Sequence, residues 1–289
     1  MSEAVKVERH GAVAVLRLDD PKAMNALSPA VKAGMQANVP KLIADAAVRA
    51  IVLTGTGKAF CAGGDIRAMT DPHGRKAPAV RARMQSAHAW ARALLDCDKP
   101  VIAAVNGAAV GGGLALALLA DIVIASRDAY FMSGYSKLGA LPDLGLLQTL
   151  PWAIGSLRAK EMILLNRRYT AEEAMAIGLA NRVVAPDRLM EEALAAAEEI
   201  AAGPAAMLTM SKVMMKRAYE ASVEEFFERE AIAQAIAFGS PEFAEGGGCL
   251  PVETKAALHV GCMRRSRNAP MRPRIGAIRL RLLRPTGLR

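Results

Sequence analysis

The chain has 289 residues, enough for one large domain or for a core with a smaller appendage. Hydrophobic residues make up 53% and charged residues 22%, which argues for a sizeable core and against wholesale disorder. Aromatic residues are only 4%, which argues against a nucleic-acid module that stacks bases. The formal net charge of +9 arises in residues 246–289, where one Lys and nine Arg face a single acid, Glu253. The rest of the chain is balanced and has no basic bias for a polyanion.

Short β-branched runs alternate with helical spacing in the first half of the chain. The predicted strands and helices, in chain order, are 12–18, 29–44, 50–55, 80–96, 101–105, a helix from about Gly111, and 121–125. Strands separated by helices of this length favour an α/β fold with crossover connections. Residues 101–126 are apolar and long enough for a membrane span. Because Asn106, Asp121 and three consecutive glycines interrupt this stretch, we interpret it as buried strands and a helix, and expect no membrane contact.

The last third of the chain is almost entirely helical in pattern. Thr170 with Glu173, and Ser222 with Glu225, have the spacing of capping boxes and predict two helix starts. Two further amphipathic helices are predicted over 186–202 and 205–219. Four methionines fall at helical spacing in the second of these, which is typical of a packing face: Met207, Met210, Met214 and Met215.

The cysteines and histidines show no metal or disulfide spacing. The four cysteines form no CxxC pair, and the four histidines are scattered. We therefore expect free thiols, a cytoplasmic location and no metal site.

Two glycine-rich segments each follow a predicted strand. Residues 60–66 read Phe-Cys-Ala-Gly-Gly-Asp-Ile, and residues 106–113 read Asn-Gly-Ala-Ala-Val-Gly-Gly-Gly. Glycine leaves backbone N–H groups accessible, and the second segment also opens a helix, whose N-terminus favours negative charge. Two such N–H groups that converge on one oxygen would form an oxyanion hole, with each donor worth about 3–4 kcal/mol. Either segment alone is typical of a turn. The two segments together, each after a predicted strand, are a more specific indication of an oxyanion hole.

The two segments, with their neighbours, resemble the crotonase (enoyl-CoA hydratase/isomerase) superfamily. The similarity is carried by residues 20–27, 55–66, 100–126 and 169–184, and it extends from about Val7 to Gly246. It implies an α/β fold with a ββα spiral core, an acyl-CoA thioester as substrate, and no cofactor apart from the coenzyme A of that substrate. It also implies a helical C-terminal part that assembles a homotrimer or a dimer of trimers. We assign the core to residues 1–200 and the trimerisation part to 201–246.

The resemblance also implies site residues. Gly64 and Gly112 would donate the two oxyanion-hole N–H groups. Other residues would contact the substrate, on the adenine and ribose side and beside the pantetheine: Lys22, Ala23, Met24, Ala26, Ala62, Asp65, Ile66 and Arg67.

The two glutamates of the family's hydratases are missing. The matching positions hold Ala115 and Tyr135. Water addition needs one group to activate water and another to protonate the α-carbon. Alanine can do neither, and neutral tyrosine is a poor base, with an unperturbed pKa of about 10. Ordinary hydration is therefore not expected.

A different carboxylate follows in the segment 131–155. This segment resembles the branch that contains the ring-opening isomerases of the phenylacetyl-CoA pathway, whose acid/base aspartate matches Asp143. A single aspartate suits a 1,3-proton shift, because it removes a proton α or γ to the thioester and returns it at the other carbon. We expect Leu138, Leu141 and Leu144 to form an apolar pocket around Asp143, and Tyr135 to line that pocket or donate a hydrogen bond. Tyr135 and Leu138 would also contact the substrate.

Several alternatives stay open. Asp143 could be a helix cap or a turn residue, because Pro-Asp is a common turn pair. The chain could also be an enoyl-CoA hydratase with a different water-activating group, a related hydrolase or decarboxylase, or a catalytically idle CoA-binding protein.

Residues 247–289 depart from the family pattern. Codons compatible with residues 247–255 give Val-Ala-Ala-Phe-Leu-Trp-Lys-Arg when read one base later, and this resembles the expected family ending. We hypothesise a frame change in this basic tail, which would then be disordered. The alternative is a genuine basic extension that binds a polyanion, and resequencing the gene distinguishes the two.

Overall fold

The computed structural model describes residues 4–70 and 76–248, and it confirms the α/β fold class. The larger sheet has six strands in the order β1-β2-β3-β5-β7-β10. Their bounds are β1 Val5–His10, β2 Val13–Leu18, β3 Ala50–Gly55, β5 Val101–Val105, β7 Ile122–Ser126 and β10 Arg182–Val184. Only the β1–β2 pair is antiparallel. The inner strands β3 and β5 are buried along their whole length because both faces of this sheet are covered.

A second sheet has four short strands in the order β4-β6-β8-β9. Their bounds are β4 Ala59–Cys61, β6 Ala108–Val110, β8 Tyr130–Met132 and β9 Tyr169–Thr170. Three of them follow a strand of the larger sheet within a few residues, so the chain passes repeatedly from one sheet to the other. Cys61 of β4 pairs with Ala109 of β6. This pairing brings together the two glycine-rich segments, which are about 45 residues apart in sequence.

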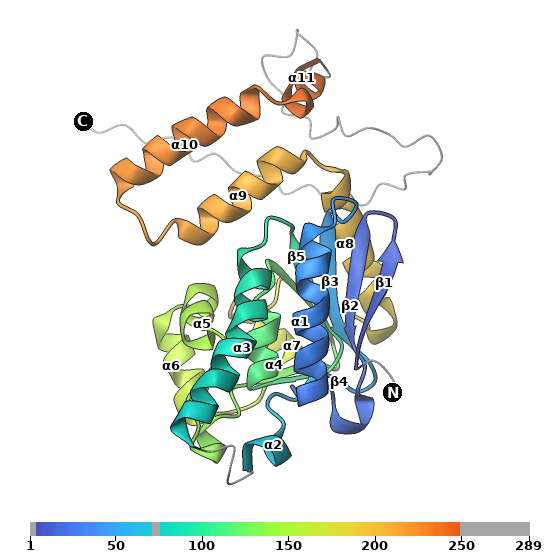
Figure 1. The fold of residues 1–289 in the computed structure, drawn as a ribbon, viewed down its shortest axis with the longest axis vertical. Coiled ribbons are helices and arrows are strands. Elements are labelled where there is room, and N and C mark those ends of the chain that lie inside the picture. Colours follow the sequence, from blue (N-terminus) through green and yellow to red (C-terminus); the bar gives the residue numbers. More distant parts are fainter. Residues whose placement is uncertain (1–3, 71–75, 249–289) are drawn as a thin grey trace, which may run out of the picture.

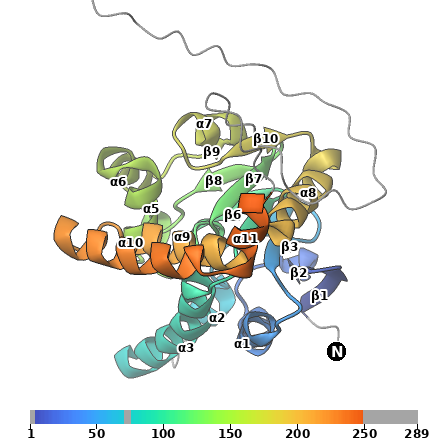
Figure 2. The same cartoon turned by 90° about the horizontal axis from the view of Figure 1, so that it is seen from above.

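Helices cover both faces of the larger sheet (Figures 1 and 2). On one face lie α1 Pro29–Ala44 and α3 Ala77–Asp96, and on the other lies α8 Leu189–Ala202. Around the second sheet are α2 Ile66–Thr70, α4 Gly112–Ala117, α5 Leu146–Ile154, α6 Ser156–Leu165 and α7 Ala171–Ala176. The apolar stretch 101–126 therefore forms β5, β6, α4 and β7, as interpreted from the sequence. Within 4–70 and 76–248, no helix is long and apolar enough to cross a membrane.

The C-terminal helices stand away from the sheets (Figure 1). They are α9 Ala205–Arg217, α10 Val223–Phe238 and α11 Pro241–Gly248. The capping boxes at Thr170–Glu173 and Ser222–Glu225 are both confirmed. The methionine face of α9 is not buried within this chain, and Met207 and Met215 are exposed. The tail beyond Gly248, including Cys249 and Cys262, lies outside the described residues.

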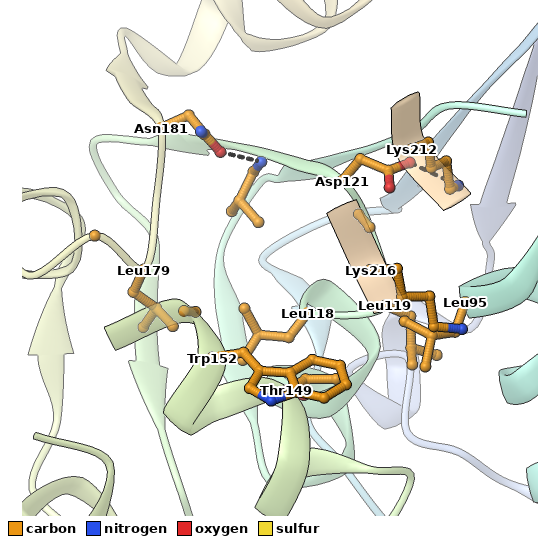
Figure 3. Close-up of a pocket in the computed structure, with 14 residues that line it drawn as sticks. Leu95, Leu118, Leu119, Asp121, Thr149, Trp152, Leu179, Asn181, Lys212 and Lys216 are labelled. Atoms are coloured by element: carbon orange, nitrogen blue, oxygen red, sulfur yellow. Dashed lines mark hydrogen bonds and ion pairs between the residues drawn. The ribbon is translucent and has the colours of Figure 1, made fainter. Parts of the chain in front are cut away.

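Lys212 attaches α9 to the core. Its Nζ atom lies 2.7 Å from an Asp121 carboxylate oxygen and donates to the Lys99 carbonyl at 2.7 Å. Thr209 adds a hydrogen bond of 3.0 Å to the Asp98 carbonyl. The ion pair borders a cavity of about 320 Å³, which Trp152 lines from α5 (Figure 3). These contacts fix the start of the C-terminal helices against the end of α3 and the start of β7.

Replacing Lys212 with Met should lower the free energy of unfolding by about 2 kcal/mol. The side chains of Lys212 and Asp121 are 10% and 32% exposed, so the loss falls below the roughly 3–5 kcal/mol of a fully buried pair. Denaturant unfolding measures this difference. Lys160→Met, an exposed position on α6, is the matched control and should change stability by less than about 0.5 kcal/mol. Equal stability of the two variants would contradict this role of Lys212.

Candidate active site

The two glycine-rich segments approach each other closely. A methyl group on Gly63 would lie 2.6 Å from the Val110 carbonyl oxygen and 3.3 Å from the Gly112 nitrogen. Gly63 also has a φ of +94°, which side chains rarely adopt. A residue larger than glycine would therefore push the segments apart. Both the conformation and the close approach require glycine here.

Gly64 and Gly112 present free N–H groups at this junction. Among the described residues, neither N–H donates a backbone hydrogen bond. By contrast, the Leu27 N–H donates to the Gly63 carbonyl at 2.7 Å, which ties residues 20–27 to the same junction. Gly64 is exposed, while Gly112 is buried at the first turn of α4. Both N–H groups therefore remain available as hydrogen-bond donors at this junction.

Tyr135 and Asp143 form a hydrogen-bonded pair beside the junction. The buried Tyr135 hydroxyl donates to Asp143 Oδ1 at 2.7 Å, and Asp143 itself is half-buried. The Tyr135 Cζ atom lies 3.8 Å from the position of a methyl group on Gly111, so the ring contacts the second glycine segment. Burial, with a further contribution from the Asp143 carboxylate, raises the pKa of Tyr135 well above its usual value. Tyr135 is therefore a proton-bearing donor at neutral pH.

Two turns hold this pair in place. The Gly134 N–H donates to Asn166 Oδ1 at 2.6 Å, and Asn166 ends α6 in the left-handed conformation. After Asp143, positive φ angles at Leu144 and Gly145 turn the chain into α5. Asp143 does lie in a turn, as the Pro-Asp alternative proposed. Its side chain, however, contacts Tyr135 and does not cap α5.

The expected apolar pocket of three leucines is wrong. Leu138 is 52% exposed and Leu141 is 76% exposed, and only Leu144 is buried. Residues 136–139 face outward because Tyr135 already fills the inner position and Gly139 turns the chain at a φ of +61°. The immediate partner of Asp143 is thus a polar hydroxyl. Leu138 as a substrate contact stays a prediction.

The residues assigned to the coenzyme A side gather near the same junction. Buried Asn25 donates to the Ala59 carbonyl at 2.7 Å, and the Ala62 N–H donates to the Met24 carbonyl at 3.0 Å. These bonds bring 20–27 beside 59–64. Asp65 accepts from the Arg67 N–H at 3.0 Å and so begins α2. The other assigned side chains are exposed or half-buried around the junction: Lys22, Ala23, Ala26 and Ile66.

Sequence reasoning missed Lys32. It is half-buried in the first turn of α1, and its N–H donates to the carbonyl of the N-cap residue Ser28 at 2.9 Å. Burial lowers its pKa, helped by the positive charge of Arg83, while the carboxylates of Asp143 and Asp65 oppose this change. The sequence did contain a signal for Lys32, namely a lysine in the first turn of the predicted helix that follows residues 20–27.

Two other residues near the site are poor candidates for the chemistry. Burial raises the pKa of the Cys61 thiol to about 12, which disfavours the thiolate needed for nucleophilic attack. Ala115 is fully buried within α4. Among the described residues, no three His, Cys, Asp or Glu side chains are grouped so that they could hold a metal ion.

Comparison with known proteins places these features in one family. Residues 8–248 match the family described as Enoyl-CoA hydratase/isomerase. The chain belongs to this family. It is 38% identical over 256 residues to a probable enoyl-CoA hydratase of Rhizobium meliloti (strain 1021), covering 88% of this chain and 97% of that protein. It is 36% identical over 245 residues to a short-chain-enoyl-CoA hydratase of Clostridium acetobutylicum, covering 83% and 88%.

Solved structures agree with this assignment. The crystal structure of an enoyl-CoA hydratase/isomerase from Cupriavidus metallidurans CH34 has a TM-score of 0.81 at 31% identity, covering 85% of this chain and 92% of that one. The chain is thus an enzyme of the enoyl-CoA hydratase/isomerase family, within the crotonase superfamily, and acts on acyl-CoA. The narrower likeness to ring-opening isomerases stays a prediction.

Proposed function

We propose that this family member isomerises the double bond of an enoyl-CoA, with Asp143 as its acid/base. The observation that carries this proposal is the Tyr135–Asp143 pair at 2.7 Å beside the glycine junction. The pair supplies one carboxylate, which a proton shift needs. It does not supply the two carboxylates of the family's hydratases.

The steps follow from the positions of these groups. The thioester oxygen would accept hydrogen bonds from the Gly64 and Gly112 N–H groups, which stabilise negative charge as it develops. Asp143 would remove a proton from the α- or γ-carbon, leaving a conjugated enolate. The same carboxyl would return the proton at the other carbon. The Tyr135 hydroxyl would hold one carboxylate oxygen and leave the second to face the substrate.

Hydration is the second candidate, and the names of the relatives favour it. Mass spectrometry detects hydration, which adds one water. Isomerisation of the 3-enoyl-CoA leaves the mass unchanged and is followed by the ultraviolet absorbance of the conjugated thioester. With a 3-enoyl-CoA and a 2-enoyl-CoA as parallel substrates, we expect an isomer of unchanged mass to form faster than any hydrated product. Rapid hydration of the 2-enoyl-CoA without isomerisation would favour the second candidate.

Tyr135→Phe should lower kcat by about tenfold to a hundredfold. A hydrogen bond to a charged group is worth about 1.5–3 kcal/mol, and this one orients the proposed base. Phenylalanine keeps the buried ring, so the KM for the thioester should change little. Steady-state kinetics measures both values. An unchanged kcat would show that the hydroxyl has no part in positioning Asp143.

The remaining assignments belong to the same proposal. We infer substrate contacts from residues 22–26 and 62–67, a cytoplasmic location, and a homotrimer or dimer of trimers. The exposed apolar side chains of α9 and α10, among them Met215, Phe227 and Ile236, support an assembly that covers them. Light scattering after size-exclusion chromatography measures the mass of the assembly.

A further inference from the structure

Leu144 occupies an uncommon position next to the proposed base. Its φ of +51° lies in the left-handed region that favours glycine, yet only 4% of the residue is exposed. A leucine in this conformation costs free energy that glycine would not. Such outliers gather at functional sites, where the surrounding structure holds them. Because glycine would avoid this strain, we look to the leucine side chain for the reason that this residue occupies the position.

Leu144 lies between Gly112 and a cavity. Its Cδ1 atom lies 3.7 Å from the position of a methyl group on Gly112, so the side chain lies beside the proposed oxyanion hole. Leu144 is also one of the residues that line a cavity of about 420 Å³ between α3, α5 and α9. Cavities of this volume are within the range of small-molecule sites.

The cavity beside Leu144 is lined by both apolar and charged residues. Its apolar lining residues include Ala91, Leu95, Leu119 and Trp152. The last three of these also line the neighbouring cavity, where they are labelled in Figure 3. Among the charged lining residues, Arg92 and Asp96 pair at 3.0 Å. An alkyl chain could therefore bury its methylene groups against the apolar residues.

The proposed function, on which this inference rests, sets the direction of the acyl chain. With the thioester oxygen at Gly64 and Gly112, the carbons that exchange a proton must lie against the Asp143 carboxyl. Leu144 follows Asp143 directly, and its side chain lies beside Gly112. Carbons beyond the reacting ones would therefore meet the Leu144 side chain before they could reach the cavity.

We propose that Leu144 is a wall that restricts this enzyme to short acyl chains, and that its removal admits a longer alkyl tail into the cavity. Leu144 is thus a residue that determines substrate specificity. The proton transfer itself does not depend on its side chain.

Binding of saturated acyl-CoA tests the wall without requiring turnover. Isothermal titration calorimetry would compare hexanoyl-CoA with dodecanoyl-CoA on the native protein, Leu144→Ala and Leu144→Gly. The native protein should bind dodecanoyl-CoA at least about tenfold more weakly, and both variants should shift the affinity ratio toward the long chain by at least about tenfold. Leu144→Gly is included in case Leu144→Ala misfolds, because glycine is unstrained at this φ.

Leu147→Ala is the matched control. Leu147 is an exposed leucine of α5, and it does not line the cavity. This variant should keep the native affinity ratio. Native protein that binds both chains equally, or an unchanged ratio in both Leu144 variants, would overturn the inference. Because binding is measured, a protein that restricts chain length but does not isomerise would contradict only the proposed function.

Discussion

Asp143→Asn is expected to lower kcat for 3-enoyl-CoA isomerisation by about 10²–10⁴-fold, the usual contribution of a positioned acid/base group. Asparagine has nearly the same shape and can still accept the hydrogen bond that Tyr135 donates at 2.7 Å. The pocket should therefore remain intact, while the group that carries the proton is lost. Steady-state kinetics measures the decrease, and calorimetry with a saturated acyl-CoA should show nearly unchanged affinity.

Asp128→Asn serves as the control for this substitution. Asp128 is exposed between β7 and β8 and is not one of the assigned site residues, so its amide variant should keep native kcat. Lost turnover with retained binding at position 143 would assign the Asp143 carboxyl to the reaction and not to substrate binding. Full activity of Asp143→Asn would remove Asp143 from the mechanism.

Gly63→Ala is expected to lower kcat by about 10²–10³-fold, the loss seen when one oxyanion-hole donor is removed. The added methyl group would lie 2.6 Å from the Val110 carbonyl and 3.3 Å from the Gly112 nitrogen. The two glycine segments must move apart, so their N–H groups no longer converge on one oxygen. Unfolding free energy should also fall by about 3 kcal/mol, from overpacking together with the strained φ of +94°.

Gly11→Ala is the control that separates the effect of backbone strain at a positive φ from the effect of steric overlap with neighbouring atoms. Gly11 also has a positive φ, of +56°, but a methyl group there would have no atom within 4 Å. This variant should lose about 1–2 kcal/mol of stability and keep native kcat. If Gly63→Ala behaved in the same way, the proposed oxyanion hole would have to lie elsewhere.

Local signals predicted much of the fold. The helix at Pro29–Ala44 and the strand at Ala50–Gly55 match their predicted bounds, because caps and apolar runs mark their ends within the local sequence. The strand Val5–His10 was missed, since its exposed positions interrupt the apolar pattern that the neighbouring strand shows clearly. The short strands of the second sheet were also missed, because three-residue strands have no period to detect.

The candidate site was less accessible to sequence reasoning. The glycine segments could be paired only through the family resemblance, since the β4–β6 contact spans distant residues. The hydrogen bond between Tyr135 and Asp143 depends on a turn at Leu144, whose left-handed backbone nothing in a leucine predicts. For the same reason the three nearby leucines were expected to share a pocket, although two of them face outward.

The measurement that tests the central claim most directly is ultraviolet absorbance of the conjugated thioester as the purified native protein acts on a 3-enoyl-CoA. If the Asp143 pair performs a 1,3-proton shift, absorbance should rise at a rate proportional to enzyme concentration and stop at the isomer equilibrium. A flat trace, from protein that binds saturated acyl-CoA normally, would contradict the isomerase and leave hydration or hydrolysis as the activity of this site.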